Sequence, residues 1–181
     1  DVERVDIGMK FGGKVPAEYL AKNPNGLIPT LEDGDFTVWE SHTIVRYLAE
    51  KYGNGAWNPG SAEGRAQASQ WMDWYLSRIH PPMTVIFWNV VRHPPEKRDT
   101  AAAAKAMHEV AKAWSILNNQ LEGREFVLGD QPSLADIPVG CAVYRWSSMD
   151  IERPSLPNLE AWYARLSSRP AYAANVMLPI T

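Results

Sequence analysis

The chain has 181 residues, of which 45% are hydrophobic and 22% are charged, a composition that excludes wholesale disorder. A chain of this size buries about 70% of its unfolded surface, so it needs no disulfide or metal to fold. Eighteen Lys and Arg against twenty-one Asp and Glu give a net charge of -3 with no long basic run, which argues against nucleic acid as a partner.

The cysteine content also limits the possible chemistry. The single cysteine, Cys141, excludes an internal disulfide and a CxxC redox pair. Such sparse cysteine usage fits a reducing, cytoplasmic location. No apolar stretch reaches 18 residues, so we expect no membrane-spanning segment.

The first 52 residues predict a mixed α/β domain. Residues 2–7 alternate apolar and charged side chains, the period of a strand with one buried face. Two further short apolar runs flank a connection with Asp33-Gly34, which is typical of a hairpin. The predicted elements are a strand at 2–7, a short helix at 16–21, strands at 27–31 and 35–39, and a helix at 41–52.

Residues 53–61 predict a linker, because they are rich in Gly, Asn and Pro, and the rest of the chain predicts helix. The helical segments are expected at 61–80, interrupted by Pro81-Pro82 and continued at 83–91, then at 99–121, from 133 onward, and at 156–166. The chain therefore divides into an α/β part (1–52), a linker (53–61) and an all-helical part (62–181).

The helix that follows Ser133 carries its own start signal. Asp136, three residues later, completes a capping box, which explains both residues without a catalytic role. The spacing then predicts one apolar face, made of Leu134, Ile137, Cys141 and Tyr144. We therefore expect Cys141 to be an inert thiol in the core.

No metal site is expected from the sequence. The histidines are widely separated, and none has a histidine partner three or four residues away; they are His42, His80, His93 and His108. The sequence has no G-x-S-x-G elbow, P-loop or dinucleotide fingerprint.

The most informative stretch joins three features that match one ligand. A cis bond at Ile28-Pro29 would leave the backbone groups of Ile28 free to pair with a peptide-like ligand. Ser41 stands at a helix N-terminus that can hold a carboxylate, Glu40 can receive an ammonium group, and Lys14 can meet a second carboxylate. The alternative is structural: a proline that leads a strand, an ordinary capping serine and a solvated lysine. Spacing alone favours this alternative.

Two sets of motifs favour the ligand-binding interpretation over the structural one. Residues 23–31 read N-P-x-G-x-I-P-x-L, and they are followed by D-G-D-F at 33–36 and by Glu40-Ser41. In the second half, F-V-L-G-D at 126–130 precedes S-L-A-D-I at 133–137. This pattern resembles the cytosolic glutathione S-transferase family over nearly the whole chain. The resemblance implies a thioredoxin-like N-terminal domain, an all-α C-terminal domain and a homodimer in the cytoplasm.

The resemblance also implies residue roles in binding glutathione, the co-substrate. Pro29 would be the cis-proline, and Ile28 would bind the cysteinyl backbone. Glu40 and Ser41 would hold the γ-glutamyl head. Lys14 is the candidate for the glycyl carboxylate on position alone.

Two parts of that site stay open in the sequence. Lys10 and Asn25 are rivals to Lys14. In the family a first strand and helix carry the Tyr, Ser or Cys that contacts the sulfur, whereas this chain starts at what resembles the second strand. We therefore expect a strand–helix segment to precede Asp1, because a strand at 2–7 would otherwise have no neighbour for its backbone groups.

The leading hypothesis is conjugation of the glutathione thiolate to hydrophobic electrophiles, a detoxification reaction, because the thiolate is the nucleophilic form of the thiol. The candidate electrophile residues, which packing would explain equally well, are Trp74, Arg78, Phe87 and Trp88. One alternative keeps the glutathione site for peroxide or disulfide reduction or for isomerisation. Another is a non-catalytic ligand-binding or assembly domain.

Overall fold

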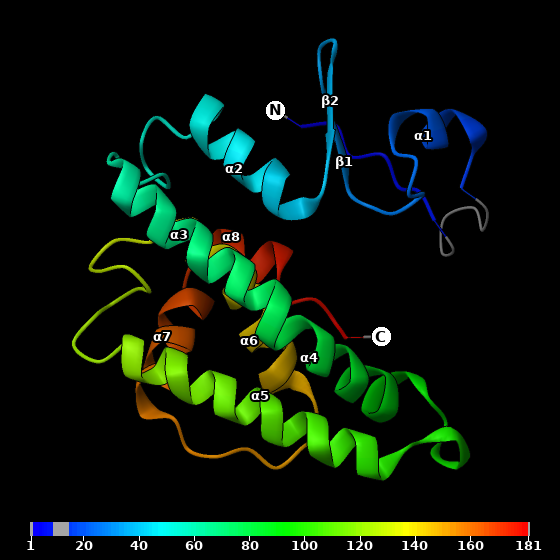
Figure 1. Ribbon diagram of the computed structural model, residues 1–181, viewed down its shortest axis with the longest axis vertical. Coiled ribbons are helices and arrows are strands. Elements are labelled where there is room, and N and C mark those ends of the chain that lie inside the picture. The colour runs from blue at the N-terminus through cyan, green and yellow to red at the C-terminus, as the bar shows by residue number, and fades with distance from the viewer. Residues whose placement is uncertain (1, 9–14, 181) are drawn as a thin grey trace. The chain divides into compact units, whose positions relative to one another are not determined.

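The computed structural model describes residues 2–8 and 15–180 (Figure 1). The chain splits into two compact units, Asp1–Gly55 and Ala56–Thr181. Among the described residues, no helix combines the length and the hydropathy needed to cross a bilayer.

The N-terminal unit is a hairpin accompanied by two helices. Strands β1 and β2 pair antiparallel, with Thr30 opposite Trp39 and Asp33 opposite Phe36. Gly34 has φ +61°, a left-handed conformation that glycine adopts without strain in a two-residue turn. Helix α2 packs on both strands, and Figure 1 shows it leading away from the foot of the hairpin. The element bounds are α1 (Ala17–Lys22), β1 (Thr30–Asp33), β2 (Phe36–Trp39) and α2 (Ser41–Tyr52).

The prediction of a strand at residues 2–7 is wrong for this chain. Within the described residues the sheet holds only β1 and β2, and residues 2–7 pair with neither. Val2 and Val5, predicted to face a core, are 86% and 70% exposed. An alternating pattern indicates a strand only where a neighbouring strand satisfies its backbone groups, and none does so here.

The first hairpin strand also begins later than residue 27, where the sequence pattern placed it. Leu27 is held outside the sheet, because its carbonyl oxygen accepts hydrogen bonds from the side chains of Tyr19 and Asn23. Pairing therefore starts at Thr30, after Pro29, which has no N–H to donate.

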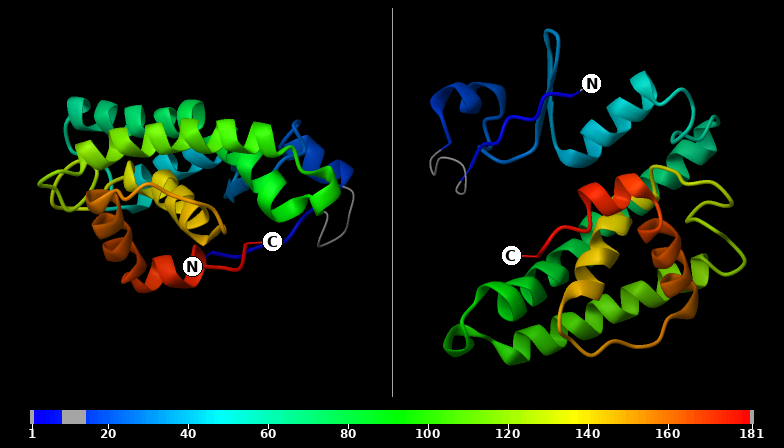
Figure 2. Two further views of the ribbon diagram at one scale, coloured as in Figure 1. Left: turned by 90° about the horizontal axis from the view of Figure 1, so that it is seen from below. Right: turned by 180° about the vertical axis from the view of Figure 1, so that it is seen from behind.

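The second unit is helical throughout its named elements. Helix α4 packs on α5, α7 packs on α5 and α6, and α6 packs on α3 (Figure 2). The bounds are α3 (Ala62–Trp74), the π-helical η1 (Tyr75–Ile79), α4 (His80–Phe87), the π-helical η2 (Trp88–Arg92), the 3-10 turn η3 (Pro95–Lys97), α5 (Thr100–Gln120), α6 (Asp136–Ser148), α7 (Pro157–Ser167) and α8 (Pro170–Asn175).

The interruption predicted at Pro81-Pro82 is a change of helix type. The π turn η1 precedes α4, and the His80 N–H donates to the carbonyl oxygen of Tyr75, five residues back. The two prolines then occupy the first turn of α4, where their missing N–H groups cost little. The chain therefore stays helical from α3 through η2 without placing a proline in the middle of an α-helix.

A buried carboxylate organises the second unit. Asp136 is 2% exposed, and its carboxylate accepts hydrogen bonds from Val127 N (3.0 Å), Ser133 N (2.8 Å), Ser133 Oγ (3.0 Å) and Trp162 Nε1 (2.9 Å). Two bonds expected of the capping box are present: Asp136 accepts from the Ser133 N–H, and Ser133 Oγ accepts from Ala135 N. The predicted helix start at Ser133 is wrong, because α6 begins at Asp136 with Ala135 as its N-cap, so these bonds shape the turn before the helix. Burial raises the pKa of the Asp136 carboxyl, and these hydrogen bonds oppose part of that rise.

The buried face of α6 differs from the predicted one, and Cys141 is exposed. The buried side chains that repeat along the helix are Asp136, Val139, Val143 and Trp146. Because Asp136 is tied to Trp162 and Val127, the face that bears this carboxylate points into the core. Cys141 lies outside that repeat, so the expectation of a core thiol is wrong.

Removing the Asp136 carboxylate should destabilise the protein strongly. Asp136→Ala leaves buried donors on Val127 and Trp162 without an acceptor, so we expect a loss of about 3 kcal/mol in the free energy of unfolding, measured by urea denaturation. Asp130→Ala is the matched control, because Asp130 is exposed and lies on the preceding loop. It should change stability by about 0.5 kcal/mol or less. Equal losses at the two positions would contradict the role given to Asp136.

Candidate functional site

The hairpin register brings the two predicted binding segments together. Thr30 and Trp39 form the last cross-strand pair at the open end of the hairpin. Pro29 precedes Thr30 and Glu40 follows Trp39, so both lie directly beyond that pair. The Ile28-Pro29 peptide bond is cis, as the sequence led us to expect. Segments that are eleven or more residues apart in the chain thus meet at one edge.

Two buried side chains hold the first segment in place. Tyr19 and Asn23 are 6% and 2% exposed. The Tyr19 hydroxyl donates to the carbonyl oxygen of Leu27 (2.7 Å) and shares a hydrogen bond with Thr30 Oγ1 (2.8 Å). The Asn23 amide donates to the same carbonyl oxygen (2.7 Å) and to Thr30 Oγ1 (3.3 Å). These bonds fix the backbone on both sides of Ile28 and Pro29.

Sequence reasoning missed both of these positioning residues. Asn23 is the first residue of the 23–31 motif and Tyr19 lies in the helix predicted at 16–21, and neither pattern predicts a positioning role. The available signal was their four-residue spacing, which puts Tyr19 one helical turn before Asn23, the residue that ends α1.

The backbone of Ile28 is left available by this arrangement. Ile28 is 67% exposed. Its N–H and C=O pair with no group among the described residues. An exposed N–H and C=O in an extended segment can pair with the backbone of an added peptide strand.

The second segment is the start of α2, and its backbone is unusual. Glu40 has φ 72° and ψ 114°, a conformation that residues other than glycine rarely adopt. Its carbonyl oxygen accepts the first helical hydrogen bond, from Ile44 N (2.9 Å), and its side chain does not cap the helix. Ser41, the first helical residue, is exposed. The first N–H groups of a helix have no intrahelical acceptor, so this terminus can receive a carboxylate.

The third predicted contact is not placed. Lys14 and its rival Lys10 lie outside the described residues. Asn25 is described, and its side-chain amide donates to Asn23 Oδ1 (3.2 Å). Its backbone N–H donates to the same oxygen (3.1 Å), so Asn25 helps to shape the turn.

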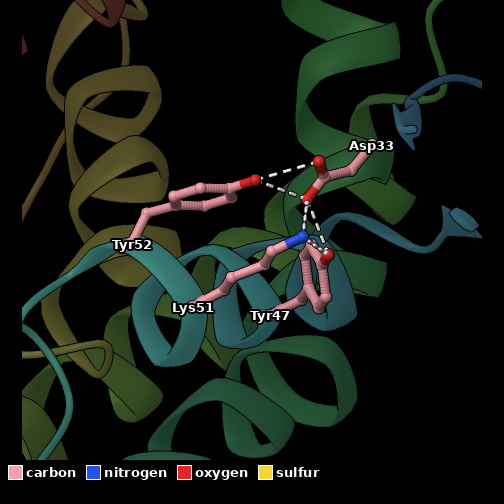
Figure 3. Close-up of polar contacts among 4 residues, drawn as sticks. All are labelled: Asp33, Tyr47, Lys51 and Tyr52. Carbon is pink, nitrogen blue, oxygen red and sulfur yellow. Dashed lines mark hydrogen bonds and ion pairs between the residues drawn. The ribbon is translucent and has the colours of Figure 1, made fainter.

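A polar cluster anchors the far end of α2 to the hairpin (Figure 3). Asp33, at the end of β1, accepts from Lys51 Nζ (2.7 Å), the Tyr47 hydroxyl (2.6 Å) and the Tyr52 hydroxyl (2.7 Å). These hydrogen bonds lower the pKa of Asp33 to about 2, with the bond from Lys51 as the largest cause. The same bond raises the pKa of Lys51. Chain continuity with β2 holds the other end of α2, so the helix that carries Ser41 is fixed at both ends.

The four candidate electrophile residues all lie along α3, η1, α4 and η2. Trp74 is half-buried and packs edge-on against Trp71, with ring centroids 5.0 Å apart. Arg78 is exposed on η1. Phe87 ends α4 and is half-buried, and Trp88 begins η2 and is 50% exposed. Their role in binding stays a prediction.

Within residues 2–8 and 15–180, no three His, Cys, Asp or Glu side chains come together as a ligand set.

The Asp33 cluster should make stability depend on pH in acid. The pKa of Asp33 is below its unfolded value of 3.8, so its contribution is present above that value and is lost as pH falls toward about 2. We expect Asp33→Asn to destabilise the protein at pH 6, with the difference from wild type shrinking between about pH 4 and 2. Urea denaturation over this range measures it.

Asp35→Asn is the matched control for this variant. Asp35 is exposed in the adjacent turn and bonds to no described residue, so its substitution should leave stability unchanged at each pH. A deficit for Asp33→Asn that is equally large at pH 6 and at pH 2.5 would contradict the assignment.

Comparisons with known proteins agree with the fold and with the predicted family. Residues 1–50 match the family described as "Glutathione S-transferase, N-terminal domain", and residues 79–170 match "Glutathione S-transferase, C-terminal domain". Glutathione S-transferase GstB of Escherichia coli K12 is 36% identical over 181 residues, covering 99% of this chain and 87% of that protein. Glutathione S-transferase F10 of Arabidopsis thaliana is 32% identical, covering 98% and 87%.

A solved structure is similar over the same extent. The theta class glutathione S-transferase of Xanthomonas axonopodis pv. citri, with glutathione bound, is 41% identical with a TM-score of 0.92. The match covers 98% of this chain and 85% of that one. The family matches in both halves, the two-stranded sheet with its helices and the helical second unit together show that this chain belongs to the glutathione S-transferase family.

Proposed function

We propose that this protein conjugates the thiolate of glutathione to electrophilic small molecules, and that Ile28, Pro29, Glu40 and Ser41 bind the tripeptide. The observation that carries the assignment is the hairpin register, because it brings an unpaired backbone segment and an uncapped helix start to one edge. The similar Xanthomonas protein, which has glutathione bound, supports the choice of ligand.

The functional groups of glutathione match this edge one by one. Its cysteinyl residue offers an N–H and a C=O, which pair with the C=O and N–H of Ile28 while Pro29 packs beside them. The γ-glutamyl carboxylate accepts hydrogen bonds from the Ser41 hydroxyl and the first N–H groups of α2. The γ-glutamyl ammonium group pairs with the Glu40 carboxylate. Lys14 remains the proposed partner of the glycyl carboxylate.

These residues bind the tripeptide, and none is assigned to its sulfur. The thiolate is the nucleophile, so conjugation needs a group that stabilises it. The electrophile is a hydrophobic small molecule bound by Trp74, Arg78, Phe87 and Trp88. A detoxification role as a cytoplasmic homodimer follows from the family resemblance, and a monomer in light scattering would contradict that part of the proposal.

The head-group assignment predicts weaker binding when the Ser41 hydroxyl is removed. Ser41→Ala should raise the Kd for glutathione about tenfold in calorimetric titration of the full-length protein, because a hydrogen bond to a charged carboxylate is lost. Thr37→Ala is the control, since it removes a hydroxyl from an exposed position of β2. An unchanged Kd for Ser41→Ala would reject the head-group site. No binding by the wild type would favour a non-catalytic assembly role.

The positioning network predicts an effect from a residue that does not touch the ligand. Tyr19→Phe removes the hydrogen bonds to Leu27 and Thr30 and so loosens the backbone around Ile28. We expect about threefold to tenfold weaker glutathione binding, while kcat at saturating glutathione stays close to wild type.

Tyr163→Phe is the matched control for this effect, because it removes a hydroxyl from a half-buried position of α7. If both variants bind glutathione equally well, Tyr19 does not position the site. Thermal melting of each variant checks that the fold is intact.

A further inference from the structure

Two guanidinium groups gather at one aromatic ring in the helical unit. The Cζ of Arg145 lies 5.1 Å from the centroid of the Phe87 ring, and the Cζ of Arg92 lies 5.4 Å from it. Arg92 follows Phe87 across the π turn η2, whereas Arg145 comes from α6. Phe87 and Arg145 thus lie in contact although they are 58 positions apart in the sequence. We call Phe87, Arg92 and Arg145 the Phe87 cluster.

The positive charge of this cluster has no acidic partner in the part of the chain that the structure describes. Neither Arg92 nor Arg145 forms an ion pair with, or donates a hydrogen bond to, any residue that the structure describes. Other arginines of the unit are engaged: Arg153 donates to Met149 O (2.7 Å), and Arg165 donates to Glu125 O (2.9 Å). Contact with a ring face offsets only part of the repulsion between two cations held this close.

Arg145 is half-buried, and its guanidinium lies over the Phe87 ring. Helix α6, which carries Arg145, packs on η1, the π turn that begins with Tyr75. Burial raises the pKa of Tyr75, and the charge of Arg145 opposes part of that rise. The Tyr75 hydroxyl shares a hydrogen bond with His80 Nδ1 (3.3 Å). Arg145 is therefore a cation over the half-buried Phe87 ring, on a helix that packs against the turn that holds Tyr75.

We propose that Arg145, assisted by Arg92, binds an anionic substituent of the electrophile, whose aryl ring packs against Phe87 and Tyr75. A guanidinium is always charged and offers paired N–H donors that match a carboxylate. This inference rests on the proposed conjugation and gives its electrophile a chemical class: aryl compounds that bear a carboxylate or a similar anion.

A suitable test substrate is 4-chloro-3-nitrobenzoate. The glutathione thiolate attacks the carbon that bears chlorine, so a C–S bond forms and the C–Cl bond breaks. Chloride leaves with the bonding electron pair, the thiol proton passes to solvent, and no oxidant or reductant is needed. The neutral comparison substrate is 4-chloro-3-nitrobenzamide, which has the same leaving group and nearly the same shape.

The kinetic experiment compares the two substrates in the full-length protein and its variants, with each kcat/KM divided by the uncatalysed rate constant. Arg145→Met should lower kcat/KM for the benzoate about tenfold and change it less than about twofold for the benzamide. Arg145→Lys should restore part of the loss, because it keeps the charge. Lys112→Met is the matched control, since it removes the same charge from an exposed position of α5 and should leave both values unchanged.

A binding experiment separates this inference from the proposed function. Calorimetric titration uses 3-nitrobenzoate, which has no leaving group and does not react. Weaker binding to Arg145→Met than to wild type supports the anion site even if neither chlorinated compound is conjugated, a result that would reject the proposed function alone. Equal losses for benzoate and benzamide, or no difference in 3-nitrobenzoate binding between wild type and Arg145→Met, overturn the anion site.

Discussion

The antiparallel register of β1 and β2 is the constraint on which the proposed binding edge depends. With Thr30 opposite Trp39, the peptide bond before Pro29 and the first turn of α2 lie at the same end of the hairpin. A shift by one residue would move every side chain of a strand to the other face and would separate the two segments. The tight turn at Gly34 and the Asp33 cluster both secure this register, one through backbone geometry and the other through hydrogen bonds to α2.

Each unit holds a helix in place with an aspartate, but the two carboxylates lie in different environments. Asp33 sits at the surface, and its ionised form is favoured by three donors, so it joins two elements at little desolvation cost. Asp136 is buried, where an ionised carboxylate is costly unless its lone pairs are occupied. Four hydrogen bonds meet that requirement and connect the loop before α6, α6 itself and α7. Each unit thus uses an aspartate to hold a helix in place. Asp33 does so at the solvent-exposed surface, and Asp136 does so in the core.

Local signals made much of the fold predictable. The hairpin, α2 and α5 are set by turn residues, apolar period and alanine content, and their bounds agree with the prediction to within about three residues. The bond from the Ser133 N–H to Asp136 and the cis bond before Pro29 are likewise local. The family resemblance then paired segments whose proximity no local pattern reveals.

The errors arose where distant contacts decide the outcome. Periodicity alone put Cys141 in the core, because nothing in the sequence shows that Trp162 and Val127 draw Asp136 inward. The predicted strand at 2–7 is absent because no neighbouring strand among the described residues pairs with it. The donors that surround Asp33 and the Tyr19 hydroxyl that holds Leu27 were missed for the same reason: each joins residues eight or more positions apart.

The left-handed backbone conformation of Glu40 affects which substitutions at this position selection would favour. A side chain held at φ 72° and ψ 114° costs of order 1–3 kcal/mol, and glycine would remove most of that strain. Glycine would also remove the Glu40 carboxylate, the group proposed to receive an ammonium ion. Selection for thermal stability and selection for ligand affinity therefore pull this position toward different amino acids. A library screened for heat resistance alone should enrich glycine at position 40 and, with it, proteins that have lost their ligand.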